Sequence, residues 1–214
     1  ALRLPPDVVA LYGKMTREAG ALFGAYHYPE FQFLIICSDE LGHFGLEHLS
    51  SSINGVRERD LIEAANRKGW IANLIPHEYV HSWCGKYRRP SGQCVPNFHT
   101  PQRTPMLWVY EGLAEYLGEL LMVRSGLVDS KEYRETLTAT IGSLMLTAGR
   151  AWRPLEDTAV AGRLLRSGSP NWNELRRSQD FYFEGALLWM EADCIIRERT
   201  HGERSLDDFC RRFM

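Results

Sequence analysis

The chain has 214 residues, of which 44% are hydrophobic and 24% are charged, and its formal net charge is -2. This balance does not favour nucleic-acid binding, and no apolar run approaches the roughly 20 residues of a membrane-spanning helix. We expect no nucleic-acid partner and no membrane segment in this chain. A short basic cluster at residues 86–89 is typical of a solvated surface. The length allows one large domain or two small ones.

The five cysteines form no CxxC pair, and an odd number is a poor basis for a disulfide framework. Cys84 and Cys94 are close enough in sequence to be bridged, but we expect all five to be free thiols. The chain begins at Ala1 without a basic and then apolar signal, so cytoplasmic and periplasmic or secreted locations both stay open. Nothing in the composition indicates an oligomeric state.

The first half of the chain alternates between helical and extended patterns. Residues 5–20 begin with prolines and end on Gly20, which predicts a helix. Residues 31–37 are rich in aromatic and β-branched side chains and predict a buried strand, and a second extended segment is expected at residues 43–51. Helices are then predicted at residues 57–69 and 71–84. The two extended segments would form a small sheet ahead of the second of these helices.

Helices dominate the second half, after an irregular connection. Residues 85–105 are interrupted by four prolines and Gly92, which predicts a long loop of the kind that is usually functional. Helices are predicted at residues 106–125, 130–149, 180–200 and 205–213. The expected fold class is therefore α+β and mainly helical, with a small N-terminal sheet beside the helix at residues 71–84.

That helix carries the most informative motif of the chain, HEYVH at residues 77–81. His77 and His81 are four residues apart, so both imidazoles can reach one metal ion from one helix face. Glu78 cannot join them as a ligand from that geometry, and it is placed to take a proton from a water molecule. The alternative is an amphipathic helix with two surface histidines. The apolar flanks favour the metal site, because buried unpaired histidines are costly.

A catalytic zinc ion, one per chain, needs a third protein ligand. Glu111 begins a predicted helix and is the candidate, while Glu115, one turn later, is suited to accept a hydrogen bond from the far nitrogen of a ligating histidine. The alternative for this pair is two solvated acids on a helix surface. The upstream motif and the apolar neighbours of Glu111 favour ligation.

Two further residues are candidates for substrate contacts. Glu47 lies in the predicted extended segment, where a peptide could pair by strand addition and the carboxylate could bind its free α-ammonium group. Tyr182 begins a predicted helix, and its hydroxyl could donate to the oxyanion of a tetrahedral intermediate. The alternatives are an exposed acid on an edge strand and a tyrosine that belongs to the core or its boundary.

Four segments together resemble the glycyl aminopeptidase family of zinc metallopeptidases, within the gluzincin group that includes thermolysin and the alanyl-type aminopeptidases. The matching segments are GLEHLSSS, PHEYVHSWCGKYRRP, LWVYEGLAEYLGELLMVRSGL, and FYFEGALLWMEADCIIRE through RSLDDF. The resemblance implies a thermolysin-like zincin catalytic domain. It also implies the following roles: His77, His81 and Glu111 as zinc ligands, Glu78 as general base, Tyr182 as oxyanion donor and Glu47 at the amine-recognition position.

The chain departs from the family pattern at one position and in its extent. Cys84 stands where the family usually has asparagine, and we interpret it as a small buried side chain rather than a stray ligand or an oxidation target. The family commonly also has an N-terminal β-rich domain and a C-terminal PDZ domain. The resemblance therefore implies that residues 1–214 are the metallopeptidase catalytic domain alone, a fragment without those flanking domains.

The expected function is zinc-dependent peptide-bond hydrolysis by an aminopeptidase, with a peptide or protein as substrate. The family likeness points to small N-terminal residues such as glycine. Two alternatives stay open: an endopeptidase on the same scaffold, in which Glu47 only lines the groove, and a catalytically inactive module that binds zinc or peptide.

Overall fold

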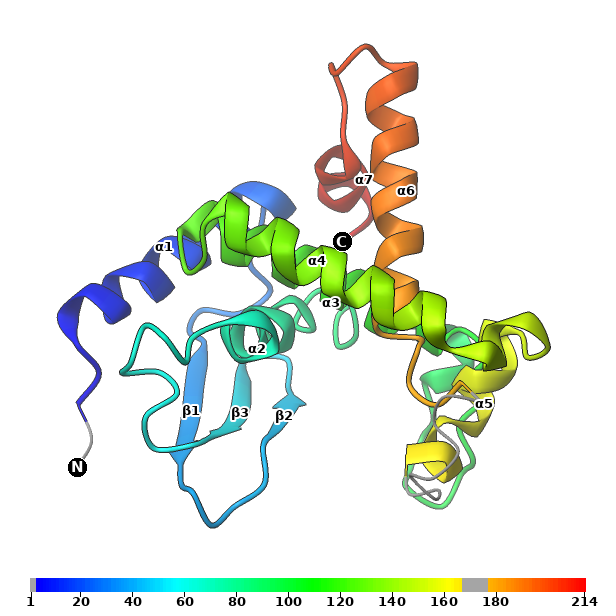
Figure 1. Cartoon of the computed structure of the whole chain (residues 1–214), viewed down its shortest axis with the longest axis horizontal. Helices are drawn as coiled ribbons and strands as arrows, with labels where there is room; N and C mark the ends of the chain where they lie inside the picture. The colour runs from blue at the N-terminus through cyan, green and yellow to red at the C-terminus, as the bar shows by residue number, and fades with distance from the viewer. Residues whose placement is uncertain (1–2, 167–176) are drawn as a thin grey trace.

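The computed structural model describes residues 3–166 and 177–214, and it is mainly helical (Figure 1). The α-helices are α1 Pro6–Phe23, α2 Gly69–Val80, α3 Leu107–Ser125, α4 Ser130–Leu146, α5 Leu155–Arg166, α6 Phe183–Arg199 and α7 Leu206–Phe213. Short 3-10 helices lie at Ser91–Gln93 and Ala148–Ala151. No helix in the described part of the chain is both long enough and apolar enough for a membrane span.

A small sheet precedes the motif helix, as predicted. It consists of β1 Gln32–Cys37, β2 Phe44–Glu47 and β3 Ser51–Val56, in the order β1-β3-β2. β1 pairs with β3 in parallel, whereas β2 pairs with β3 antiparallel, with Gly45 opposite Asn54. The extended segment expected at residues 43–51 is thus the first half of a hairpin, and β2 lies at an edge of the sheet.

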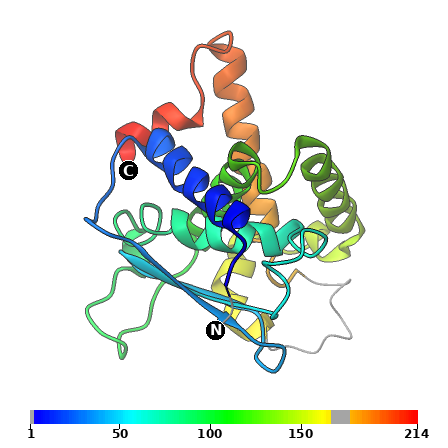
Figure 2. The ribbon, with the colours of Figure 1, turned by 90° about the vertical axis from the view of Figure 1, so that its left-hand side faces the viewer.

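The edge strand β2 directs alternate residues to opposite faces of the sheet. Gly45 and Glu47 are half-buried, whereas Phe44 and Leu46 are exposed. α2 covers the sheet and contacts both β2 and β3, as the side view of Figure 2 shows. Gly45 and Glu47 therefore face the helix that carries the HEYVH motif.

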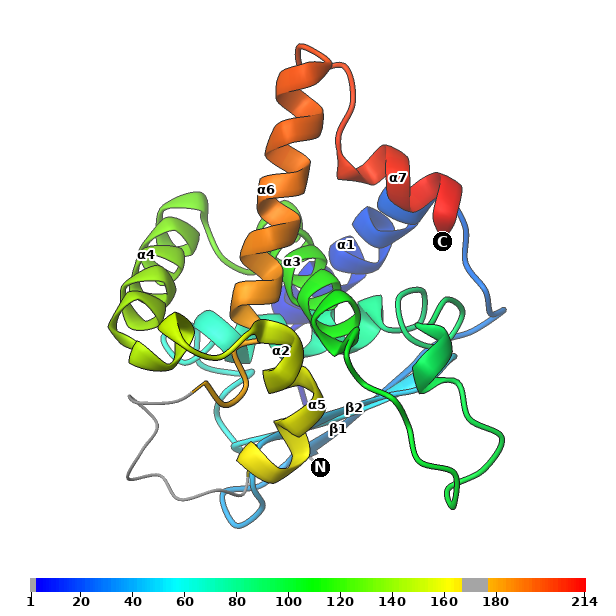
Figure 3. The ribbon, with the colours of Figure 1, turned by 90° about the vertical axis from the view of Figure 1, so that its right-hand side faces the viewer.

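α2 and α3 form the centre of the molecule (Figure 3). All residues from 72 to 80 of α2 are buried, which confirms the prediction of a buried motif helix. α3 contacts α1, α2, α5 and α6. Its apolar residues join those of α1 and α2 in the main core, where Trp83 stacks on Phe23 with ring centroids 4.3 Å apart.

Glycines allow α3 to approach both of its main partners closely. A β-carbon on Gly118 would lie 3.0 Å from the backbone nitrogen of His77 on α2. On the preceding turns of α3, a β-carbon on Gly112 would collide with the backbone of Gly185 on α6. Only glycine fits at such crossings without a backbone shift. These contacts bring the motif helix, α3 and the start of α6 together.

The structure corrects several predicted elements. The helix predicted at residues 57–69 is wrong, because this segment forms successive turns. The Asp60 carboxylate accepts a hydrogen bond from the Arg57 backbone nitrogen at 3.0 Å and also contacts His43, and such side-chain bonds compete with helix formation. α1 continues past Gly20 to Phe23, where Gly24 ends it in the left-handed conformation, and α5 is an additional helix.

Candidate active site

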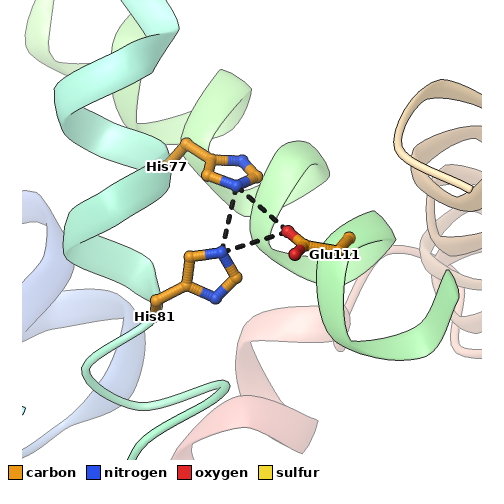
Figure 4. A group of neighbouring side chains, drawn as sticks. All are labelled: His77, His81 and Glu111. Atoms are coloured by element: carbon orange, nitrogen blue, oxygen red, sulfur yellow. Dashed lines mark hydrogen bonds and ion pairs between the residues drawn. The ribbon is translucent and has the colours of Figure 1, made fainter. Parts of the chain in front are cut away.

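Three side chains from α2 and α3 point toward one another (Figure 4). The Nε2 atoms of His77 and His81 lie 3.0 Å apart. Glu111 Oε2 lies 3.3 Å from the first of these nitrogens and 3.2 Å from the second. Among the described residues, these three make up the group of His, Cys, Asp or Glu side chains that could hold a metal ion.

An oxygen atom lies close to the outer nitrogen of each imidazole. His77 Nδ1 lies 2.9 Å from Glu115 Oε2, and His81 Nδ1 lies 2.9 Å from the carbonyl oxygen of Cys84. An acceptor at Nδ1 places the proton there, so the neutral ring presents the lone pair of Nε2. Two nitrogen lone pairs and a carboxylate oxygen therefore converge on one point. Such an arrangement is suited to hold a cation between them.

The donor set and its spacing fit zinc. Tetrahedral zinc with ligands at about 2.0–2.1 Å holds neighbouring ligand atoms roughly 3.3 Å apart, close to the separations found here. Burial opposes charge on all three side chains, yet His81 and His77 lower the pKa of Glu111 to about 2. Despite the same burial, the surrounding carboxylates raise the pKa of both histidines. The group therefore favours positive charge at its centre.

Glu78 lies beside this group and faces the edge strand. Its carboxylate is so close to the backbone of Gly45 that a β-carbon there would overlap Oε1. Burial raises the pKa of Glu78 above its ordinary value, with a smaller contribution from Glu47 and Glu111, while the two imidazoles oppose this shift. A carboxylate with a raised pKa beside such a group is suited to accept and return a proton.

Two donors hold the carboxylate of Glu47, which lies close to the three converging side chains. The Tyr110 hydroxyl donates to Glu47 Oε1 at 2.6 Å, and Lys86 Nζ lies 3.1 Å from the same oxygen. Burial would raise the pKa of Glu47, but the neighbouring imidazole of His81 and the two donors together lower it. Glu47 is therefore a fixed anion close to the three converging side chains.

Tyr182 lies at the N-terminus of α6, where the Gly112–Gly185 crossing brings it to the site. Its ring centroid is 5.9 Å from that of His77. Tyr182 lines a cavity of about 300 Å³ together with Glu78 and His77. This cavity also reaches His43 and Trp70. A second cavity, of about 200 Å³, is lined in part by Glu47 and Glu111. The possible ligands thus border two cavities, His77 the first and Glu111 the second.

Several residues with contacts at the site were not singled out from the sequence. Lys86 belongs to the basic cluster that was interpreted as solvated surface, but it pairs with Glu47. Tyr110 was treated only as part of the segment before Glu111. Gly45 was quoted with its motif but given no role, although the GLE spacing already places it on the same strand face as Glu47.

The cysteines agree with their predicted state. All five are free thiols. Cys84 is buried, its thiol lies 3.6 Å from the Tyr110 carbonyl oxygen, and burial raises its pKa. It is not a member of the possible metal group, and its contribution to the site is the backbone carbonyl that contacts His81.

Comparison with solved structures finds a protein with a similar fold. The chain is similar to the crystal structure of an aminopeptidase N family protein from Idiomarina loihiensis, with a TM-score of 0.88 and 24% sequence identity. The match covers all of this chain and 37% of that one, so the chain spans little more than a third of the length of this relative. The likeness shows that the chain has the same α+β, mainly helical fold as that part of the relative.

The family follows from the sequence match. Residues 70–188, more than half of the chain, match the model of the M61 glycyl aminopeptidase family. The chain belongs to this family, in agreement with the resemblance found in its motifs. No curated protein sequence matches the chain significantly. The matched segment contains all the candidate site residues except Glu47.

Proposed function

We propose that the chain is the catalytic domain of a zinc-dependent aminopeptidase, with His77, His81 and Glu111 as zinc ligands. The observation that carries this proposal is the placement of Glu47 and Gly45 on one face of the edge strand, with Gly45 against Glu78. Glu47, which would bind the substrate's amino group, is thereby two strand positions from Gly45, the residue that lies against the general base. Such spacing leaves room for one residue ahead of the cleaved bond.

The side chains divide the chemistry between them. Bound zinc supplies a Lewis acid that lowers the pKa of water and polarises the scissile carbonyl. Glu78 takes a proton from the attacking water and returns one to the leaving amine. Tyr182 donates to the oxyanion that forms as water attacks. Glu115 holds the proton on Nδ1 of His77, which keeps Nε2 free to ligate.

The exposed edge of β2 provides a track for the substrate. A peptide that adds as a further strand would form backbone hydrogen bonds with β2, and its α-ammonium group would meet Glu47. The cavity beyond Glu47 has a volume of only about 200 Å³. A substrate-binding strand edge that ends in a small cavity favours removal of single N-terminal residues over cleavage within a chain.

Hydrolysis of paired peptides tests the proposal. We expect an unblocked peptide to be cleaved after its first residue, the same peptide with an acetylated amino terminus to resist cleavage, and a chelator to abolish activity that added zinc restores. Equal cleavage of both peptides would instead establish an endopeptidase. Zinc binding without hydrolysis of any peptide in a broad panel would establish an inactive binding module.

A further inference from the structure

The cavity of about 300 Å³ has two ends with different side chains. At one end it is lined by His77, Glu78 and Tyr182, which the proposed chemistry uses. At the other end it is lined by His43 and Trp70, which that chemistry leaves without a role.

His43 continues the row of side chains that faces the motif helix from the edge strand. It comes directly before β2, and it is half-buried like Gly45 and Glu47, whereas the residues between them are exposed. Side chains on one face of an extended chain are two residues apart. A peptide with its α-ammonium group on Glu47 and its first peptide bond beside Gly45 would run antiparallel to β2. Its second residue would then lie beside His43.

The motif helix leads in the same direction. Trp70, Leu74 and His77 are at positions i, i+4 and i+7 of α2, so they lie along one face of the helix. All three line the cavity. From His77, one of the possible metal ligands, this face leads toward the N-terminus of α2 and to Trp70. The strand and the helix therefore both direct the cavity from the site of cleavage toward His43 and Trp70.

Trp70 packs against a side chain that is itself held in place. The ring centroids of His43 and Trp70 lie 5.0 Å apart at an interplanar angle of 82°, which is an edge-to-face contact. Nε2 of His43 donates to Asp60 Oδ2 at 3.0 Å, and Asp60 is only 7% exposed. Trp70 remains 47% exposed. The indole is thus supported by His43 and still has surface open to a ligand.

We propose that this end of the cavity receives the side chain of the residue that follows the cleaved bond, and that it selects large apolar side chains, above all aromatic ones. Trp70 packs on that side chain, and His43 is a positioning residue that acts through Trp70. This inference rests on the proposed aminopeptidase function and concerns the second substrate residue. An aromatic ring in contact with an indole buries a large apolar area in a favourable geometry.

The carboxylates of this cavity do not favour a basic side chain at its far end. Glu115 pairs with His77, and Glu78 lies against Gly45, so both are at the end where cleavage would occur. Buried Leu74 contributes an apolar wall between that end and Trp70. Selection at Trp70 should therefore depend on apolar contact rather than on charge.

Kinetics with amides that have glycine first and differ only in the second residue test this assignment. For the native chain, kcat/KM should be about tenfold higher with phenylalanine than with alanine as the second residue, a difference of about 1.4 kcal/mol. Trp70→Ala should abolish this preference. The loss should appear mainly in KM, because packing on an indole is the same in the ground state and the transition state.

Phe98→Ala is the matched control, because Phe98 is a fully exposed aromatic side chain that lines neither cavity of the site. Its ratio of phenylalanine to alanine substrate should equal that of the native chain. His43→Ala should lower the ratio by about threefold, because Trp70 loses its edge-to-face contact. His43→Gln should restore part of it, since the glutamine amide can still donate to Asp60. A purely structural defect would affect both substrates alike.

The outcomes separate this inference from the function on which it rests. Hydrolysis of both amides with equal kcat/KM overturns the aromatic selection and leaves the aminopeptidase intact. A preference for lysine as the second residue also overturns it, since the carboxylates would then select the side chain. An equal loss of the ratio in Trp70→Ala and Phe98→Ala overturns the assignment to Trp70. Absence of hydrolysis with every unblocked substrate overturns the aminopeptidase proposal and this inference with it.

Discussion

The backbone of Gly45 lies against the carboxylate of Glu78, so closely that a β-carbon on residue 45 would overlap Glu78 Oε1. Gly45 belongs to the edge strand, and Glu78 belongs to the buried motif helix. The contact sets the proposed general base directly beside the strand that would hold the substrate. A side chain at residue 45 would have to displace Glu78, although no turn or positive φ demands glycine at this point of β2.

Gly45→Ala should therefore impair catalysis without releasing the metal. The added methyl group displaces the Glu78 carboxylate, and a displacement of about 1 Å of a catalytic group can cost roughly 100-fold in rate. We expect kcat to decrease by at least tenfold while zinc content stays at one per chain. Gly42→Ala is the control, because a β-carbon there meets nothing within 4 Å. Equal activity in the two variants would contradict a positioning role for Gly45.

Motif spacing placed His77 and His81 on one face of a helix, and Glu111 and Glu115 on one face of the next. Spacing alone would have left the two acids as solvated side chains, and it was the upstream motif with the apolar neighbours of Glu111 that favoured a shared site. The small sheet and the buried character of α2 also followed from apolar patterns. These features are local, and local periodicity is what a sequence encodes most directly.

The contacts that tune the site could not be predicted because they join distant segments. Nothing in the neighbourhood of Lys86 indicates that it lies beside Glu47, since the pairing depends on how the turn after α2 packs against β2. The segment at residues 57–69 has a helical composition, but Asp60 forms side-chain hydrogen bonds that replace the helix. In both cases, contacts that the local sequence does not reveal determined the structure.

Glu111 and Glu115 should differ in their effects on metal binding. Glu111→Ala removes a proposed ligand, and we expect elemental analysis to find almost no zinc after dialysis. Glu115→Gln keeps the shape of the side chain but weakens the contact with His77 Nδ1, and loss of such a partner typically lowers metal affinity about 10- to 100-fold. Full zinc occupancy in Glu111→Ala would exclude this residue as a ligand.

Tyr110→Phe should reduce the discrimination between free and blocked amino termini. Without the hydroxyl, Glu47 Oε1 loses one of the two side chains that hold it in position, while Lys86 remains. We expect the ratio of kcat/KM for free over acetylated peptides to decrease by about tenfold, mainly through the free peptide. Tyr116→Phe is the control, because it removes a comparable bond to Asp193 from the same helix, away from the site. A decrease in both variants would indicate a general loss of stability.

Glu119 should make stability depend on pH above the ordinary range of a carboxyl group. Burial, together with the nearby charge of Glu115, raises the pKa of Glu119 to about 8, although the Tyr133 hydroxyl opposes this shift. The folded chain therefore binds a proton that the unfolded chain releases near pH 4.5. Stability is retained below that pH and decreases as the pH rises from about 4.5 through about 8.

Glu119→Gln removes this penalty, since glutamine keeps a polar group for Tyr133 but cannot ionise. With chelator present throughout, we expect the variant and the native chain to unfold at similar temperatures at pH 5. At pH 9 the variant should unfold at a temperature several degrees higher. Glu135→Gln, at an exposed position on α4, should show no such divergence between the two pH values. A constant difference between native chain and Glu119→Gln at both pH values would mean that Glu119 ionises normally.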